Sequence, residues 1–203
     1  MGADTKIEWT DRETTASKRI PALFSGAMIR AIRREVAPKT MTRRTSDKWA
    51  KARPGDVLWT RETWGPCAGG IVYRADDVGG TVRSPDGGKW RPSIFMPSWA
   101  SRNDLEIVSI RRERVQDISD ADIAAEGVDA EAVEALWNAA TRKRRREVNE
   151  AFGYGPDHAG AVVGSSTRPR DLWRIAWTLI TGAKSWDENG FVWAIQFARV
   201  GGR

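Results

Sequence analysis

Apolar residues recur at helical spacing in several parts of the chain. A narrow stripe predicts a helix over 25–36, with Ser25 as its N-cap. A short helix is expected over 119–125, and a longer one begins at the capping residue Asp129. Leucine, isoleucine and alanine share one face of the segment 171–181, which predicts a further helix.

Strand-like patterns alternate with these helices. They cover 57–64, 71–74, 105–115 and 191–197, and turn residues separate the first three. Residues 1–19 are polar and predict a loosely held tail. Since a terminal strand is stable only when it is paired, the last strand is expected to close a sheet. The order of elements predicts an α+β fold with a small mixed or antiparallel sheet against helices.

Composition narrows the class of protein. The 203 residues are enough for one domain, and 40% hydrophobic and 30% charged residues predict a globular core. A single cysteine, Cys67, and a single histidine, His158, exclude a disulfide framework and argue against thiolate or histidine metal sites, so we expect neither metal nor cofactor. No apolar run is long enough for a membrane span, and we expect a cytoplasmic protein without membrane contact.

Charge points to an acidic partner. The net charge is +6 and the sequence pI is about 9.8. Residues 1–60 carry 13 basic and 7 acidic side chains, 61–140 carry 9 and 14, and 141–203 carry 11 and 6. Nucleic acid is the commonest partner of such basic regions. The strongest phosphate-contact signal is the run Arg142, Lys143, Arg144, Arg145 and Arg146, although a solvated helix face would have the same composition.

A short basic motif follows the first predicted helix. Lys39 and Arg44 stand five positions apart, and Ala37 occupies a position where a related pattern has glycine. Further motifs follow in order: Pro54-Gly55-Asp56, Trp59-x-Arg61-Glu62-Thr63-Trp64, Tyr73-Arg74-Ala75-Asp76, the segment from Trp90 to Arg102, Gln116-Asp117-Ile118-Ser119, Ala125-Glu126-Gly127-Val128, and Trp186-Asp187-x-Asn189-x-Phe191-Val192-Trp193. This ordered series resembles the phage and prophage branch of the ASCH family, which has a PUA-like fold.

The resemblance implies a small curled β-barrel or mixed sheet with flanking helices and a cleft between them. It makes 20–203 one ASCH/PUA-like domain, with a variable helical insertion at about 130–170. Domains of this kind bind RNA or modified nucleotides, so the expected partner is RNA, DNA or a modified nucleoside held in a basic cleft.

The resemblance also implies a catalytic trio. One ASCH branch is similar to amidohydrolases that remove the acetyl group from N4-acetylcytidine, and Lys39, Thr42 and Glu126 fall on its three residues. Thr42 needs a neighbour to take its proton, and Lys39 can do so only if burial or nearby positive charge depresses its pKa. One helical turn would place Lys39 and Thr42 on one face, whereas an extended chain would separate them.

Other residues are candidates for contact with a nucleic acid. The segment 90–102 is expected to form the rim of the cleft, and its arginines suit phosphate. One tryptophan could stack on a base, although most of the eleven are expected in the core. The candidates are Arg43, Arg44, Arg61, Trp64, Arg91, Ser93 and Arg102.

Four functions therefore compete. The first is a module that binds nucleic acid or a modified nucleotide, and the second is an amidohydrolase in the same cleft. A ribonuclease is a third, but the single histidine limits the usual acid–base pair. The acidic middle region keeps a fourth open, a phage protein that binds and inhibits a host protein.

Overall fold

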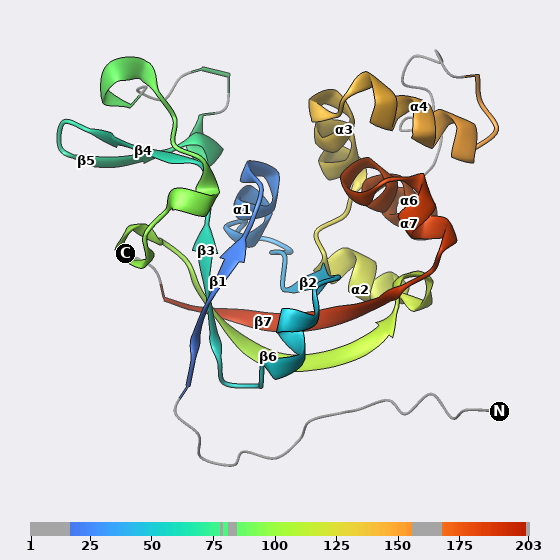
Figure 1. Ribbon diagram of the computed structural model, residues 1–203, viewed down its shortest axis with the longest axis horizontal. Helices are drawn as coiled ribbons and strands as arrows, with labels where there is room; N and C mark the ends of the chain where they lie inside the picture. The colour runs from blue at the N-terminus through green and yellow to red at the C-terminus, as the bar shows by residue number, and fades with distance from the viewer. Residues whose placement is uncertain (1–16, 78, 81–84, 156–167, 202–203) are drawn as a thin grey trace.

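A mixed sheet of five strands runs through the molecule (Figure 1). The computed structural model describes residues 17–77, 79–80, 85–155 and 168–201. The strands are β1 (Arg19–Leu23), β2 (Met41–Arg44), β3 (Val57–Arg61), β6 (Asp104–Arg114) and β7 (Phe191–Gly201), in the spatial order β1-β3-β6-β7-β2. β1 and β3 are parallel, and the other neighbours are antiparallel. The α+β class is confirmed, but the described strands leave β1 and β2 as edges and do not close a barrel.

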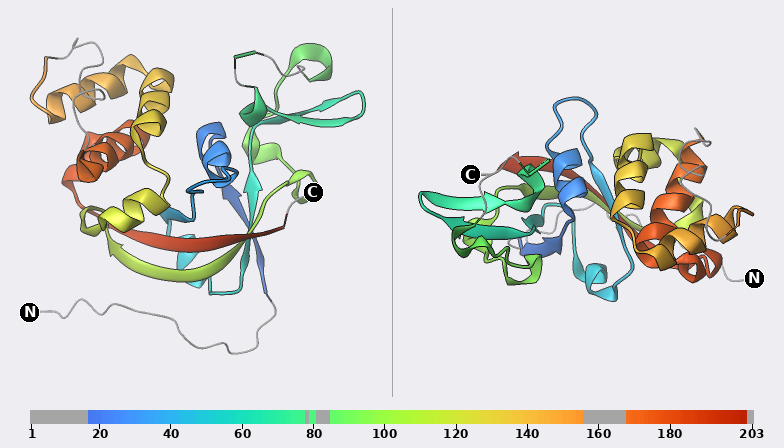
Figure 2. Two further views of the ribbon diagram at one scale, coloured as in Figure 1. Left: turned by 180° about the vertical axis from the view of Figure 1, so that it is seen from behind. Right: turned by 90° about the horizontal axis from the view of Figure 1, so that it is seen from above.

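A hairpin and a group of helices lie on opposite sides of α1 (Figures 1 and 2). The hairpin consists of β4 (Trp64–Cys67) and β5 (Gly70–Tyr73). The group consists of α2 (Asp120–Ala125), α3 (Ala130–Ala139), α4 (Arg142–Ala151), α6 (Pro169–Thr181) and α7 (Ala183–Asp187), and α1 spans Gly26–Ile32.

The predicted N-caps are confirmed. Ser25, Ser119 and Asp129 each accept a hydrogen bond from the backbone N–H three residues later, at 3.3, 3.2 and 2.7 Å. These bonds satisfy N–H groups that the first turn of a helix leaves without a partner. They fix where α1, α2 and α3 begin, and α1 and α3 both border the site described below.

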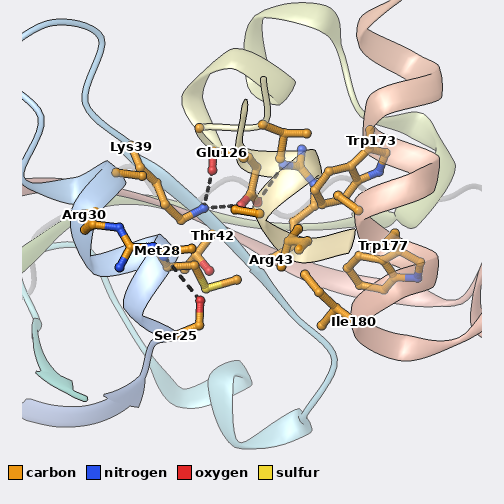
Figure 3. A pocket seen from close by; sticks show the side chains of 18 of the residues that line it. Ser25, Met28, Arg30, Lys39, Thr42, Arg43, Glu126, Trp173, Trp177 and Ile180 are labelled. Carbon is orange, nitrogen blue, oxygen red and sulfur yellow. Dashed lines mark hydrogen bonds and ion pairs between the residues drawn. The ribbon is translucent and has the colours of Figure 1, made fainter. Parts of the chain in front are cut away.

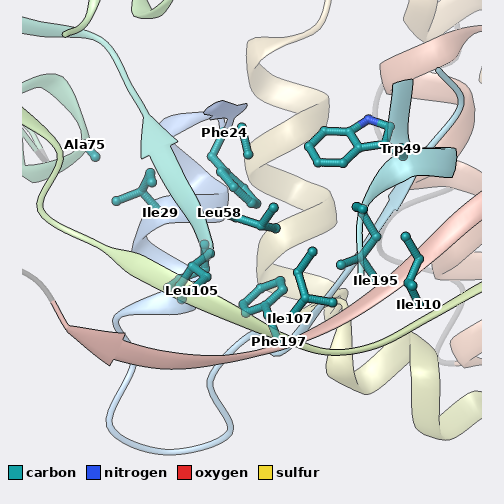
Figure 4. Close-up of a cluster of buried hydrophobic side chains, with 13 residues drawn as sticks. Phe24, Ile29, Trp49, Leu58, Ala75, Leu105, Ile107, Ile110, Ile195 and Phe197 are labelled. Carbon is teal, nitrogen blue, oxygen red and sulfur yellow. The ribbon is translucent and has the colours of Figure 1, made fainter. Parts of the chain in front are cut away.

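The main core lies between α1 and one face of the sheet (Figure 4). Phe24 packs edge-on against Phe197 with 6.4 Å between ring centres. Leu58 and Ile107 are fully buried in the same cluster. A second cluster joins α3, α4 and α6, and a third joins α2 and α6 to the far ends of β6 and β7.

Three elements differ from the prediction. β1 begins inside the predicted tail, and β2 was not predicted because only one of its four residues is apolar. β2 forms because the edge of β7 pairs with it, which is a tertiary effect. The strand predicted over 57–64 ends at β3, and Trp64 starts the separate hairpin.

The first helix is also shorter than predicted. α1 ends at Ile32, and the Lys39 N–H donates to the Ala31 carbonyl at 2.9 Å. Ala37 has a φ of 47°, so the chain turns back onto the helix at the position where the family pattern has glycine. This reversal brings Lys39 beside the helix.

Two parts of the sequence interpretation fall on residues that the structure does not describe. These are residues 1–16 of the expected tail and residues 156–167 of the expected insertion, with His158. Within the described ranges, no helix is long and apolar enough to cross a membrane.

Candidate functional site

A cavity of about 430 Å³ opens between α1 on one side and α3 and α6 on the other (Figure 3). β2 and the residues after α2 connect these two walls. The three residues predicted as catalytic, Lys39, Thr42 and Glu126, all line it. They come from the turn before β2, from β2 itself and from the C-terminal end of α2. The fold thus brings together residues that are up to 87 positions apart in the sequence.

Lys39 is held in place by backbone and side-chain contacts. Its Nζ donates to the Glu126 carboxylate oxygen Oε2 at 2.5 Å and to the Glu126 backbone carbonyl at 2.7 Å. The backbone N–H of Thr40 donates to the Ala125 carbonyl at 2.8 Å, which ties this turn to the end of α2. Both Lys39 and Glu126 are buried.

Gly127 makes this contact possible. Its φ of +68° lies in the left-handed region, and a Cβ there would stand 3.2 Å from the Lys39 Cβ and 3.3 Å from the Ala31 Cβ. A side chain at this position would therefore be strained and would crowd the lysine. The glycine lets the end of α2 lie directly against the turn that carries Lys39.

Burial lowers the pKa of Lys39 below its ordinary value. The negative charge of Glu126 opposes this change, while the positive charges of Arg44 and Arg43 add to it. Desolvation disfavours the charged form of an amine, so the neutral form becomes accessible at lower pH than in a surface lysine. This is the condition that a lysine must meet to accept a proton.

Arg43 anchors the carboxylate of Glu126 from the other side. Its side chain is fully buried, and its Nη1 donates to Glu126 Oε1 at 3.1 Å. It also pairs with Glu113 and with Asp122, at 2.8 and 2.9 Å, and both of these carboxylates pair with Arg111 as well. Arg43 was predicted to contact nucleic acid. In the structure its guanidinium pairs with three carboxylates of the same chain, those of Glu113, Asp122 and Glu126.

Thr42 and Arg44 point to the same face of β2 because side chains alternate along a strand. Thr42 is in an extended chain, so the helical turn that would pair it with Lys39 does not exist. Lys39 and Thr42 nevertheless both line the cavity, because Lys39 precedes the strand and lies in the chain reversal after α1 (Figure 3).

Arg44 is a cation in the cavity wall without a carboxylate partner among the described residues. Its guanidinium lies over the Phe24 ring at 4.7 Å and the Trp49 ring at 5.9 Å. Its Nε and Nη2 are buried and have no hydrogen-bond partner within the described chain. Burial lowers its pKa, and Glu126 opposes that change. An arginine of this kind favours a ligand that brings an acceptor or a negative charge.

The walls of the cavity are mainly apolar and aromatic. Trp173 and Trp177 of α6 line it, with ring centres 5.4 Å apart, and the Arg43 guanidinium lies 5.6 Å from the Trp173 ring. Met28 and Ile180 lie nearby (Figure 3). Sequence reasoning missed these four residues as site residues. A signal was present, since Trp173, Trp177 and Ile180 follow helical spacing on one face.

Several predicted contacts lie elsewhere. The segment 90–102 lies outside the cavity lining and does not form its rim. Arg61 donates to two backbone carbonyls, Trp64 is buried, and Arg102 is buried in an ion pair with Glu62. Within this predicted set, only Arg43 and Arg44 line the cavity.

The basic run lies on α4 and also outside the cavity lining. Arg144 pairs with Glu147 at 2.7 Å, and Arg145 donates to the backbone carbonyls of Trp137 and Asn138. The remaining members of the run are exposed. Their proposed contact with phosphate stays a prediction.

Comparison with known proteins gives no match: no family model, no curated protein and no solved structure matches the chain. Among the described residues, no group of three or more histidine, cysteine, aspartate or glutamate side chains is placed to hold a metal ion.

Proposed function

We propose that the cavity binds a single modified nucleoside of the N4-acylated cytidine type. The observation that carries this proposal is the pairing of apolar, aromatic walls with a few converging polar groups in a cavity of about 430 Å³. Small-molecule sites have this composition and a volume of about 300–1,000 Å³. In this proposal the base lies among Met28, Trp173 and Trp177, which line the cavity.

The polar groups suit a base with carbonyl and amino groups. The cavity lining has five cations, Arg30, Arg34, Lys39, Arg43 and Arg44, and two carboxylates, Glu126 and Glu131. Both carboxylates have cationic partners, and Arg43 and Arg34 also pair with acidic residues outside the lining, namely Glu113, Asp122 and Asp129. Arg44 has no carboxylate partner among the described residues, and a cation of this kind favours a carbonyl oxygen or an anion. In this proposal Arg44 donates to a carbonyl oxygen of the ligand, and Glu126 accepts from its amide N–H.

The resemblance to the ASCH family supports the same interpretation. The hallmark residues Lys39 and Arg44 line the same cavity as Thr42 and Glu126, the other two members of the implied catalytic trio. A mixed sheet with helices on both sides of a ligand cavity is also what a PUA-like domain would need. The family and the PUA-like fold remain part of the proposal.

Binding is tested by calorimetric titration with N4-acetylcytidine. The wild-type protein is expected to bind one molecule. Ala135→Phe, which fills the cavity from α3, should lose this binding, whereas Ala139→Phe on an exposed position of the same helix should retain it. Equal binding by the two variants, or no binding by the wild type, would contradict the proposal.

Amide hydrolysis is a second candidate, favoured by the lowered pKa of Lys39, which lines the same cavity as Thr42. In this reaction neutral Lys39 takes the hydroxyl proton as the Thr42 oxygen attacks the acyl carbonyl. Collapse of the tetrahedral intermediate breaks the C–N bond, and Lys39 returns the proton to the leaving amine of cytidine. Water then cleaves the Thr42 ester and releases the carboxylic acid.

Hydrolysis is tested by chromatographic detection of cytidine formed from N4-acetylcytidine. Thr42→Val should abolish turnover, and Thr42→Ser, which keeps a hydroxyl, should retain part of it. Cytidine formation by Thr42→Val at the wild-type rate would exclude Thr42 as the nucleophile.

A further inference from the structure

Large apolar side chains gather on the surface of the segment after the hairpin. Ile94, Phe95 and Trp99 are 53%, 67% and 63% exposed, although they lie within six consecutive residues. Clusters of exposed apolar groups mark interaction sites more often than single ones do. We call Ile94, Phe95, Trp99 and the adjacent Arg91 the Trp99 surface. None of them lines the cavity.

The backbone under the Trp99 surface is firmly attached to the fold. Arg61 donates to the carbonyls of Ile94 and Met96, at 2.6 and 3.1 Å, and the Tyr73 hydroxyl donates to the Ala100 carbonyl at 2.8 Å. The Met96 side chain is fully buried between the exposed residues. The apolar side chains are therefore held outward by a fixed backbone, and a partner would not have to order this segment on binding.

Arg91 and Trp99 are attached to the same support. The Trp64 and Arg91 backbones exchange two hydrogen bonds, at 2.7 and 3.2 Å. The Arg91 guanidinium lies over the Trp64 ring at 4.9 Å, and the Trp99 ring meets Trp64 edge-on with 6.2 Å between centres. A cation and an exposed ring thus flank one buried tryptophan.

The charge of this segment has one sign. Residues 87–103 contain Lys89, Arg91 and Arg102 and no acidic residue. Arg102 is buried with Glu62, whereas Lys89 and Arg91 are exposed. An exposed surface that combines the rings of Phe95 and Trp99 with the exposed cations Lys89 and Arg91 complements a polyanion that has accessible aromatic faces.

We propose that the Trp99 surface binds a single-stranded nucleic acid. Bases of a single strand can stack on Phe95 and Trp99, and its phosphates can pair with Arg91 and Lys89. A duplex keeps its bases stacked inside and cannot use the rings. This site is separate from the cavity and does not depend on the function proposed for it.

The test is fluorescence anisotropy with a labelled 20-nucleotide oligo-uridine, oligo-thymidine and a DNA duplex of the same length. The wild-type protein should bind the single strands more tightly than the duplex, and Phe95→Ala and Trp99→Ala should each weaken single-strand binding about fivefold to a hundredfold. Arg91→Ala should reduce the slope of affinity against salt concentration. Both aromatic positions are exposed, so the folded state should survive these changes.

Three matched controls keep the result interpretable. Val36→Ala, at an exposed apolar position on another loop, and Ala135→Phe in the cavity should leave strand binding unchanged. Arg142→Ala with Lys143→Ala tests the basic run of α4. Binding that is lost only in the α4 variant, or absent in the wild type, would overturn the proposal. So would a wild-type dimer that Phe95→Ala with Trp99→Ala converts to a monomer, because the surface would then be a protein interface.

Discussion

Two buried clusters of opposite charges lie in this molecule, and they have different surroundings. In one, Arg102 pairs with both oxygens of Glu62, at 2.8 and 2.9 Å, lies over the Tyr73 ring at 4.0 Å and reaches Asp76. Neither member of the Glu62–Arg102 pair lines the cavity. In the other, Lys39 and Glu126 face the cavity together with Thr42.

The pKa shifts follow the same division. Burial works against the charge of Arg102, but its hydrogen bonds to Glu62 and Asp76 outweigh burial and raise its pKa. For Lys39 burial outweighs Glu126 and lowers the pKa. Arg102 is thus held in its charged form. Burial raises the pKa of Glu62, although the hydrogen bonds and charge of Arg102 oppose that change. For Lys39, burial makes the neutral form more accessible than in a surface lysine. A buried ion pair alone does not indicate a functional site. A pair that faces a cavity and contains a group with a pKa shifted towards proton release is a stronger candidate.

The largest expected effect is on chemistry at Lys39. Lys39→Met should lower hydrolysis of N4-acetylcytidine by about 10²- to 10⁴-fold, the usual contribution of a general base. Glu126 keeps Arg43 as a partner, so the variant should fold. Chromatography and circular dichroism measure the two properties. A folded variant with wild-type turnover would remove Lys39 from the reaction.

The next effect is on stability at the other cluster. Glu62→Ala leaves Arg102 buried without its bidentate partner and should lower the free energy of unfolding by about 3–5 kcal/mol. Urea denaturation measures this loss. Glu62→Leu combined with Arg102→Met should recover most of it, because neither charge remains buried. A double variant as unstable as Glu62→Ala would show that the charges themselves are required.

A smaller effect is expected at Arg44. Arg44→Met removes a charged donor from the cavity wall while keeping contact with Phe24 and Trp49. Since hydrogen bonds from charged groups contribute about 1.5–3 kcal/mol, affinity for N4-acetylcytidine should fall about tenfold to a hundredfold. Calorimetry measures it, and stability should change little or rise, because Nε and Nη2 have no partner to lose in the described chain. Unchanged affinity would exclude Arg44 from ligand contact.

The smallest effect is a change of stability with pH. The folded-state pKa of Lys39 lies below its ordinary value of 10.5. Between these two values the unfolded chain binds more protons, so the stability of the wild type should rise with pH relative to Lys39→Met, by at most about 1.4 kcal/mol per pH unit. At pH values below both pKa values, the difference in unfolding free energy between the wild type and Lys39→Met should not change with pH. Urea denaturation at several pH values measures this slope. A decrease of wild-type stability relative to Lys39→Met between the two pKa values would show that folding raises the pKa of Lys39.

Motif positions selected three residues that lie in one cavity, but the sequence did not predict how the chain is arranged around them. Lys39, Thr42 and Glu126 were chosen from motif positions, and the structure places all three in one cavity. Their arrangement depends on β2, whose four residues have no strand-like pattern and pair with β7 only in the folded chain. Local patterns do not contain such long-range pairing.

Other errors have a similar cause. The caps Ser25, Ser119 and Asp129 were predicted because capping is local. The segment 90–102 was placed at the rim because its composition suits phosphate, but composition does not determine on which side of α1 it packs. Most of the tryptophans were expected in the core, and only the fold shows that Trp173 and Trp177 also border the cavity.

The most direct test of the cavity as a nucleoside site is a crystal structure of the Thr42→Val variant soaked with N4-acetylcytidine. This change blocks attack on the acyl group and leaves the cavity nearly the same size. The ligand is expected between α1 and α6, with its acyl group beside residue 42 and within hydrogen-bond distance of Arg44 or Lys39. An empty cavity at saturating ligand, or ligand bound only elsewhere, would contradict the assignment.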